Sequence, residues 1–270
     1  MRKSKSKLIA LMISALCTGA SGDPAKADPL EILVPAYFYP SGKGLLHWNE
    51  LIKSARRAPI VVILNPSSGP GHALDANYKK VSSRARSAGV KVLGYVSTNY
   101  SERARDRVLH DILLYRDLYE VDGFFIDEMS SSAQGAPQAY YQGLYSFIKL
   151  LNERYLVVGN PGADFDHRNS GARFADTLVT HENHGRSAYA VLTKVQTGQR
   201  TPTYKDALLA YEVEPGINVQ LIFQAAIRRD TSMIYLTDNL RGPNPWDTLP
   251  SYWPDLVTLV CKHNGNKDCK

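Results

Sequence analysis

The sequence predicts an α/β fold, a single (β/α)8 TIM-type barrel in which eight parallel strands alternate with helices. Three observations support this prediction. Short apolar runs alternate with longer amphipathic segments, eight such runs occupy about 240 residues, a typical length for this fold, and no linker or low-complexity stretch divides them. An open doubly wound sheet is the alternative, and it requires one of the eight strands to be absent.

The strands are predicted from short runs rich in β-branched and aromatic side chains. The run from Ile60 to Leu64 is apolar throughout, as expected for a strand buried on both faces. Pro35 indicates that the first strand is not regular along its whole length. In chain order, the predicted strands are residues 31–39, 60–64, 90–96, 124–126, 155–159, 177–180, 207–213 and 233–237.

The segments between the strands are predicted to be helices because their apolar residues recur every three or four positions. In the first of them, Trp48, Leu51 and Ile52 share one face. Gly89 follows the second, where glycine readily adopts the left-handed conformation that ends a helix. The predicted helices are residues 45–57, 75–88, 102–119, 136–154, 187–195, 218–229 and 249–261, and residues 196–205 are expected to form a polar loop.

Residues 1–27 have the pattern of a secretory signal peptide. Basic residues at the start are followed by an apolar run from Leu8 to Ala15 that is too short to span a bilayer. An Ala-Lys-Ala sequence ends the segment, so we expect cleavage before Asp28, with cleavage after Ala20 or an uncleaved anchor as alternatives. The barrel domain then covers residues 28–270, and the protein is expected to be secreted, periplasmic or at the cell surface.

Removal of this segment changes what the charge and the cysteines imply. It carries five of the 32 Lys and Arg residues and one of the 26 Asp and Glu residues, so the remaining net charge is +2 rather than +6. That balance does not indicate nucleic-acid binding. Cys261 and Cys269 remain, and in an exported protein such a pair predicts a disulfide. We expect a monomer with no membrane span after signal removal.

The central predicted strand, Phe124 to Ile126, is followed at once by two carboxylates, Asp127 and Glu128. Burying one carboxylate beside apolar residues is costly, and two adjacent ones repel each other. In a parallel α/β fold, ligands bind at the C-terminal ends of the strands. The pair is therefore a candidate catalytic site, the alternative being that Asp127 caps the next helix and Glu128 is a solvated loop residue.

Polar side chains follow the other strands as well, and a barrel would gather them on one face. Carboxylates, amides and tyrosines dominate the set, without a Ser-His-Asp arrangement. The glycine-rich loop 65–71 lacks the Lys-Ser/Thr of a phosphate-binding loop. Trp246, Tyr252 and Trp253 could be a sugar platform or core residues. The candidate residues at strand ends are Tyr37, Tyr39, Asn65, Thr98, Tyr100, Asp127, Glu128, Asn160, Glu182, Asp238 and Asn239.

A carboxylate pair with aromatic platforms is what glycoside hydrolysis needs, because one carboxyl protonates the leaving oxygen and the other attacks C1 or activates water. Strand alternation implies that only one of Asp127 and Glu128 points straight into the barrel. His181 and His184 do not form the helical His-Glu-x-x-His zinc motif, so we predict no metal and no cofactor, and expect these histidines to orient Glu182.

Several ordered motifs resemble the spherulin-4 family, which includes glycoside hydrolase family 135. They are Val34-Pro-Ala-Tyr-Phe-Tyr-Pro40, Asn65-Pro-Ser-Ser-Gly-Pro-Gly71, Gly94-Tyr-Val-Ser-Thr98, the Asp-Gly-Phe-Phe-Ile-Asp-Glu within 119–128, and Asn160-Pro-Gly162. The resemblance implies a (β/α)8 barrel and endo-cleavage of α-1,4-linked N-acetylgalactosamine in a galactosamine-rich biofilm exopolysaccharide. It also implies functional carboxylates at Asp127, Glu128 and Glu182.

We therefore predict an exported glycoside hydrolase with a polysaccharide substrate, in which Glu182 and one of Asp127 and Glu128 form the acid and the nucleophile or base. Retention or inversion of configuration stays open. A cell-surface barrel that binds glycan without cleaving it is the alternative. The predicted substrate-binding residues are Tyr37, Tyr39, Asn65, Thr98, Tyr100, Asn160 and Asp238.

Overall fold

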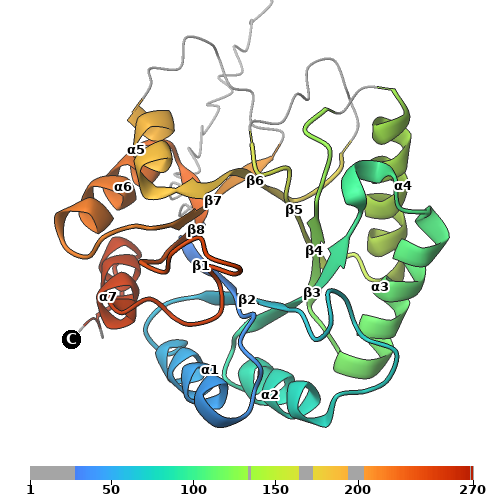
Figure 1. The fold of residues 1–270 in the computed structure, drawn as a ribbon, viewed down its shortest axis with the longest axis horizontal. Helices are drawn as coiled ribbons and strands as arrows, with labels where there is room; N and C mark the ends of the chain where they lie inside the picture. Colours follow the sequence, from blue (N-terminus) through green and yellow to red (C-terminus); the bar gives the residue numbers. More distant parts are fainter. Residues whose placement is uncertain (1–27, 133–134, 164–172, 194–203, 268, 270) are drawn as a thin grey trace, which may run out of the picture.

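The computed structural model describes residues 28–132, 135–163, 173–193, 204–267 and 269. They form a closed barrel of eight parallel strands in chain order, because β1 pairs with β8 as well as with β2 (Figure 1). The predicted (β/α)8 barrel is confirmed, and the open-sheet alternative is wrong. The strands are β1 (Glu31–Pro35), β2 (Ile60–Leu64), β3 (Lys91–Ser97), β4 (Gly123–Asp127), β5 (Leu156–Gly159), β6 (Thr177–His184), β7 (Lys205–Tyr211) and β8 (Thr231–Leu236).

In the part of the chain that the structure describes, seven α-helices surround the barrel (Figure 1). A short 3-10 turn, η1 (Asn99–Ser101), follows β3. The predicted signal peptide and most of the predicted polar loop at residues 196–205 lie outside the described residues. The helices are α1 (Gly42–Ser54), α2 (Ala76–Ser87), α3 (Arg105–Tyr119), α4 (Ala136–Leu151), α5 (Gly185–Thr193), α6 (Ile217–Arg228) and α7 (Trp253–His263).

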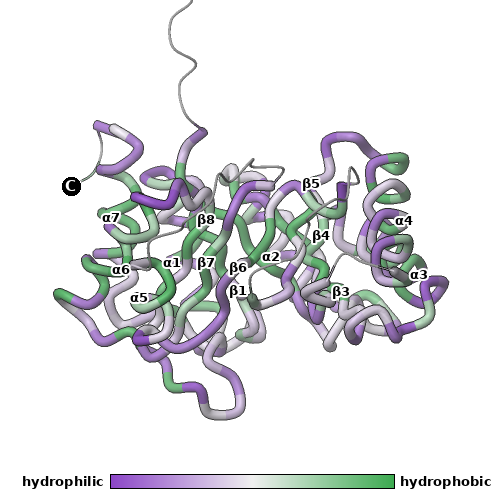
Figure 2. The backbone as a smooth tube through the Cα atoms, turned by 90° about the horizontal axis from the view of Figure 1, so that it is seen from above, coloured by the Kyte–Doolittle hydropathy of each residue, from purple (hydrophilic) through white to green (hydrophobic). Residues whose placement is uncertain are grey.

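The core lies inside the strands and between them and the helices. Figure 2 shows hydrophobic residues concentrated along the strands and hydrophilic ones along the outer loops. All five residues of β2 are buried, as expected for a strand covered on both faces. Along β4, Phe124 packs edge-on against Tyr155, whereas Phe125 stacks on Tyr95 of β3. The alternation of β4 therefore sends successive residues to opposite sides of the barrel wall.

Two strand ends differ from the sequence prediction by four residues, whereas the other boundaries agree within two. The first strand ends at Pro35 rather than at residue 39, because the chain leaves the sheet after a residue that has no backbone N–H to donate. The sixth strand continues past Thr180 to His184, since β6 pairs with β7 along this whole stretch, with a register shift between Val179 and His181. Glu182 therefore lies within β6 and not in a loop after it.

The C-terminal end is held by the predicted disulfide, Cys261–Cys269, which is formed with a Cα–Cα distance of 5.5 Å. Cys261 is in α7, so the bond ties the last described residues back to that helix. Among the described residues, no helix combines the length and the apolar character needed to cross a bilayer.

Candidate active site

Asp127, the last residue of β4, lies at the mouth of the barrel. Phe125 pairs with Tyr95 in register, and Asp127 follows two residues later, so the three side chains share the inner face of the sheet. The carboxylate of Asp127 accepts a hydrogen bond from Asn160, whose Nδ2 lies 2.7 Å from Oδ1. Burial raises the pKa of this carboxyl, and the Tyr95 side chain and the backbone N–H of Glu128 oppose that rise.

Asn160 links this carboxylate to a second one. The same Nδ2 atom lies 2.5 Å from Oε2 of Glu182 on β6, so these two carboxylate oxygens are at most about 5 Å apart. Asn160 directly follows β5, and its backbone N–H and carbonyl bond Ile126 and Met129 on either side of Asp127. Its Oδ1 accepts the N–H of Gly162, which orients the amide. The bridge is therefore fixed by backbone contacts.

Glu182 and Asp127 respond differently to these surroundings. Burial, and then the nearby charge of Asp127, raise the pKa of Glu182 to about 7, against the opposing effect of hydrogen bonds from Asn160 and Trp246. Burial also raises the pKa of Asp127, but the donors on that group favour its charged form. The pair can therefore hold one proton near neutral pH, and Glu182 is the better-placed holder.

Glu128 lies just outside the strand, and its side chain does not point straight into the barrel, as alternation predicts for one member of the acidic pair. Its backbone is left-handed, with φ of 51°, which turns the chain away from β4. Its carbonyl accepts hydrogen bonds from Tyr100 N at 2.7 Å and from Thr98 Oγ1 at 2.9 Å. Its carboxylate accepts one from the hydroxyl of Ser97 on β3. Thr98, which is fully buried, therefore positions the acidic pair from below.

Tyr37 and Tyr100 border the carboxylates. Tyr37 follows β1 and is edge-on to Tyr95, with ring centroids 5.9 Å apart. Burial, and then the charge of Asp127, raise the pKa of Tyr37 well above its usual range, so its hydroxyl stays neutral. Tyr100 is exposed, at 59%, on the left-handed turn η1. Its backbone N–H, rather than its ring, is the group that contacts Glu128.

The remaining predicted site residues mainly hold their own loops. Asn65 Oδ1 accepts the N–H of Gly69 at 2.9 Å, which closes the glycine-rich loop. The hydroxyl of Tyr39 donates to Asp75 at the start of α2. Asp238 accepts hydrogen bonds from the backbone and the side chain of Ser251. Asn239 donates through Nδ2 to the carbonyls of Pro245 and Thr248.

Two residues of the cluster were not predicted from the sequence. Tyr95 lies within a predicted strand, where its spacing of two from Ser97 could have indicated an inward side chain. Trp246 lies between β8 and α7, in no predicted element, and local sequence gives no signal for its contact with Glu182. Trp246 is 6% exposed and Trp253 is 2% exposed, so both are core residues and not an open sugar platform.

The histidines beside Glu182 make local contacts. His184 Nδ1 accepts the N–H of Ser187 at the start of α5, at 3.2 Å. His181 is buried, at 7% exposure. Within the described ranges, no group of three or more His, Cys, Asp and Glu side chains is placed to hold a metal ion.

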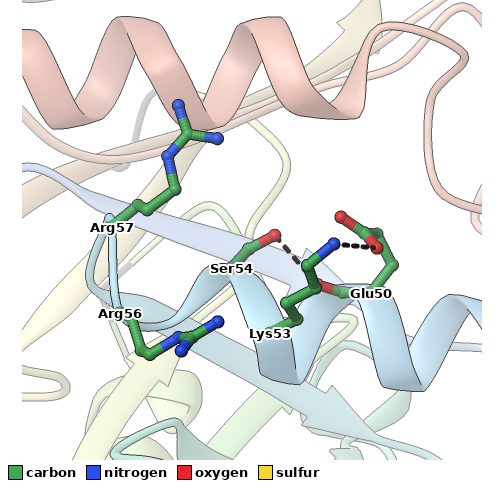
Figure 3. A pocket seen from close by; sticks show the side chains of 5 residues that line it. All are labelled: Glu50, Lys53, Ser54, Arg56 and Arg57. Atoms are coloured by element: carbon green, nitrogen blue, oxygen red, sulfur yellow. Dashed lines mark hydrogen bonds and ion pairs between the residues drawn. The ribbon is translucent and has the colours of Figure 1, made fainter. Parts of the chain in front are cut away.

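A separate hollow of about 330 Å³ lies beside the last turn of α1 (Figure 3). That turn leads into the N-terminal end of β2, so the hollow is at the opposite end of the barrel from Asp127. A guanidinium N–H of Arg57 donates to Thr258 of α7 at 2.7 Å, and the indole of Trp253 donates to Ser54. These contacts belong to the packing of α1 against α7. The hollow is lined by Glu50, Lys53, Ser54, Arg56 and Arg57.

The geometry at the barrel mouth suits acid–base catalysis, in which one carboxyl group donates a proton and the other acts as a nucleophile or base. Glu182 and Asp127 lie close together and accept hydrogen bonds from the same amide, and their surroundings affect their two pKa values differently. Such an arrangement separates an acid from a nucleophile or base. The charges of both carboxylates act on Tyr37 and Tyr95, which therefore lie close to the pair.

Comparisons with known proteins agree with this fold. Residues 31–260 match the sequence profile of Spherulation-specific family 4. Spherulin-4 of Physarum polycephalum is 29% identical over 243 residues, which cover 87% of this chain and 71% of the relative.

Two solved structures share the barrel. Sph3 of Aspergillus clavatus, crystallised in complex with GalNAc, superposes with a TM-score of 0.71 at 23% identity, covering 87% of this chain and 99% of the other. A noncanonic maltogenic α-amylase, AmyB of Thermotoga neapolitana, gives 0.55 at 11% identity, covering 88% and 77%.

Proposed function

Because the chain belongs to Spherulation-specific family 4, we propose that it is a glycoside hydrolase that cleaves an amino-sugar exopolysaccharide. The observation that carries the proposal is the Asn160 bridge between Asp127 and Glu182, with the pKa of Glu182 raised to about 7. A carboxyl that keeps its proton near neutral pH can protonate a glycosidic oxygen. A neighbouring carboxylate that accepts a hydrogen bond from Asn160, with Tyr95 and the backbone of Glu128 favouring its charged form, can stay ionised and meet C1.

In the proposed reaction, Glu182 donates its proton to the leaving oxygen while the bond from C1 to that oxygen breaks. Asp127 attacks C1 and forms a glycosyl ester. Glu182 then takes a proton from water, the resulting hydroxide equivalent attacks C1, and Asp127 leaves as a carboxylate. The short separation of the two carboxylate oxygens, at most about 5 Å, favours this retaining route over an inverting one, which needs room for water between the carboxyls.

The proposed substrate is a polymer of α-1,4-linked N-acetylgalactosamine, cleaved within the chain. Similarity to Sph3, which was crystallised with GalNAc, supports the sugar. In an α-linked sugar of this type, the 2-acetamido group lies on the same face as the leaving oxygen, so it cannot attack C1 from the opposite face. A protein nucleophile is therefore required, and Asp127 takes that part in our proposal. Tyr37 and Tyr100 would contact the sugar, and Glu128 would bind its hydroxyl groups.

We also propose that the barrel, residues 28–270, acts outside the cytoplasm after removal of residues 1–27. The disulfide Cys261–Cys269 supports this placement, because such bonds persist in oxidising compartments.

The test is reducing-end release from purified residues 28–270 on a panel of polysaccharides that includes galactosaminogalactan. We expect release by the wild type and by Asp117→Asn, a control that changes an exposed carboxylate on α3. Asp127→Asn and Glu182→Gln should lose roughly a hundredfold or more in rate while far-UV circular dichroism shows that both remain folded.

Full activity in either variant would contradict the assigned roles. Binding without release from any polymer, equal in wild type and Glu182→Gln, would instead identify a glycan-binding barrel.

A further inference from the structure

The hydroxyl group of Tyr141 lies against the loop that follows β4. Tyr141 is on α4 and is 2% exposed, so its side chain offers almost no surface to a substrate. Its oxygen accepts the backbone N–H of Ser130 at 2.8 Å and lies 3.2 Å from Oγ1 of Thr98, which is fully buried. One buried hydroxyl therefore connects α4 both to the loop after β4 and to the residue that follows β3.

The direction of each hydrogen bond in this group follows from the number of protons. Oγ1 of Thr98 also lies 3.0 Å from the carbonyl oxygen of Asp127 and 2.9 Å from that of Glu128. Carbonyl oxygens only accept, so the single hydroxyl proton of Thr98 is directed at them, and Tyr141 donates its own proton to Oγ1. The result is a chain of donors that runs from the N–H of Ser130 through Tyr141 and Thr98 to the two carbonyls.

This chain ends on the backbone of the acidic pair, where one residue is left-handed. Glu128 has φ of 51°, which is unfavourable for a residue other than glycine and persists only where the surroundings fix it. Its carbonyl accepts the hydroxyl of Thr98 and, at 2.7 Å, the N–H of Tyr100. The N–H of Thr98 donates to the carbonyl of Asp127 at 3.0 Å. These contacts fix the peptide groups on which the directions of both acidic side chains depend.

We propose that Tyr141 is a positioning residue for the pair formed by Asp127 and Glu128: its hydroxyl holds the Thr98 hydroxyl toward the two carbonyls and thereby fixes the direction of both carboxylates. This inference rests on the proposed role of Asp127 as the nucleophile. Loss of the phenol oxygen would leave the N–H of Ser130 without its acceptor and Oγ1 of Thr98 without its donor. A displacement of about 1 Å at a reacting group can lower a rate about a hundredfold.

The positioning role can be measured without a substrate, by native-state amide hydrogen exchange of the folded barrel. Tyr141→Phe keeps the ring and removes the hydroxyl. It does not touch the N–H of Tyr100, whose acceptor is the carbonyl of Glu128. We expect the protection of that N–H to fall roughly fivefold or more, because its acceptor is no longer held in place. Unchanged protection of the Tyr100 N–H in Tyr141→Phe would overturn the proposal.

Tyr145→Phe is the matched control, because Tyr145 lies one turn further along α4 and its hydroxyl donates to Asp176 at 2.9 Å. This variant also loses one phenol oxygen from the same helix, but that oxygen is not part of the chain that ends on the acidic pair. It should leave the exchange of the Tyr100 N–H at the wild-type rate. An equal loss of protection in both variants would show a general loosening of α4 and would contradict the inference.

Kinetics on a cleaved polysaccharide test the consequence for the reaction. Tyr141→Phe and Thr98→Val should each lower kcat roughly tenfold or more with KM changed less than about threefold, because neither buried side chain touches the sugar. Thr98→Ser keeps the hydroxyl and should retain kcat within about threefold. Since the two hydroxyls act in one chain, the double variant should be no slower than the slower single variant. Tyr145→Phe should keep the wild-type values.

A wild-type kcat in Tyr141→Phe, a loss confined to KM, or losses that multiply in the double variant would contradict the inference. If the wild type cleaves no polysaccharide, the proposed hydrolase function fails, and the exchange of the Tyr100 N–H still decides whether Tyr141 holds the acidic pair.

Discussion

Asp127 and Glu182 differ in what surrounds their carboxyl groups. Both are partly buried at the barrel mouth, and both accept a hydrogen bond from Asn160. Burial raises both pKa values; Tyr95 and the backbone of Glu128 oppose that rise at Asp127, whereas the charge of Asp127 adds to it at Glu182. The balance of donors and charge, and not the residue type, makes Glu182 the acid in our proposal.

The raised pKa of Glu182 predicts a pH-dependent cost in stability. Its folded pKa of about 7 exceeds the ordinary value of 4.5, so the stability associated with the neutral form is fully present below pH 4.5 and is lost as the pH rises through 7. Glu182→Gln cannot ionise. Relative to the variant, the wild type should therefore lose on the order of 3 kcal/mol of unfolding free energy between pH 4.5 and pH 8.

Urea unfolding of the wild type and Glu182→Gln at these two pH values measures that difference. Asp127 is present in both proteins, so its own titration serves as a common background. Parallel pH dependences in the two proteins would show that Glu182 is not held neutral by its surroundings.

At this scale the sequence indicated candidate site residues but not their partners. The acidic pair at the end of a buried strand indicated Asp127, and the same reasoning indicated Glu182 and Asn160. That one amide atom bridges both carboxylates depends on distances between strands, which no local pattern encodes. Trp246 lies near Glu182 on a loop that Asn239 closes with hydrogen bonds to Pro245 and Thr248.

At the scale of elements, the turn after β3 and the residue after β4 support each other. Asn99, Tyr100 and Ser101 all have positive φ, of 44°, 55° and 75°, and so does Glu128. Such conformations cost of order 1–3 kcal/mol each for residues other than glycine. The hydrogen bonds from Tyr100 and Thr98 to the carbonyl of Glu128 hold both segments in place.

The contact between β3 and α3 gives a prediction about how two elements pack together. A Cβ on Gly94 would lie 2.5 Å from Cγ of Tyr115, a fully buried ring whose hydroxyl donates to Leu64. Gly94→Ala should therefore lower the unfolding free energy by about 1–3 kcal/mol, since the ring cannot retreat. Chemical denaturation measures this change.

Gly143→Ala in α4 is the matched control, because its added Cβ would meet only a guanidinium nitrogen of Arg105, at 3.0 Å. A glycine-to-alanine change inside a helix is expected to stabilise by up to about 1 kcal/mol. Equal effects of the two substitutions would contradict the role of close packing at Gly94.

Element boundaries were predictable where the hydrophobic pattern was unbroken. The strand Ile60–Leu64 was predicted with its observed bounds because every residue is apolar. The strand β6 was predicted too short, because His181 to His184 are polar and lie in a strand through pairing with β7. Tertiary pairing overrode the local preference there.

At the scale of the whole molecule, barrel closure brings the site together. Pairing of β1 with β8 places Tyr37 and the Trp246 loop on the same ring as Asp127 and Glu182. The eight alternations in the sequence predicted this closure, because each βα unit must cover its strand on both faces. The separation of the carboxyls, which decides between retention and inversion, depends on the closed ring and could not be predicted from the sequence.

The most direct test of the assigned pair is chemical rescue by azide on an activated aryl α-N-acetylgalactosaminide oligosaccharide, with the product anomer determined by NMR. Asp127→Ala should yield the β-glycosyl azide, because azide replaces the nucleophile on the face opposite the leaving group. Glu182→Ala should yield the α-glycosyl azide, because azide attacks the ester on Asp127 after the aryl group has left. The same anomer from both variants, or no rescue of either, would contradict the assignment of Asp127 as nucleophile and Glu182 as acid.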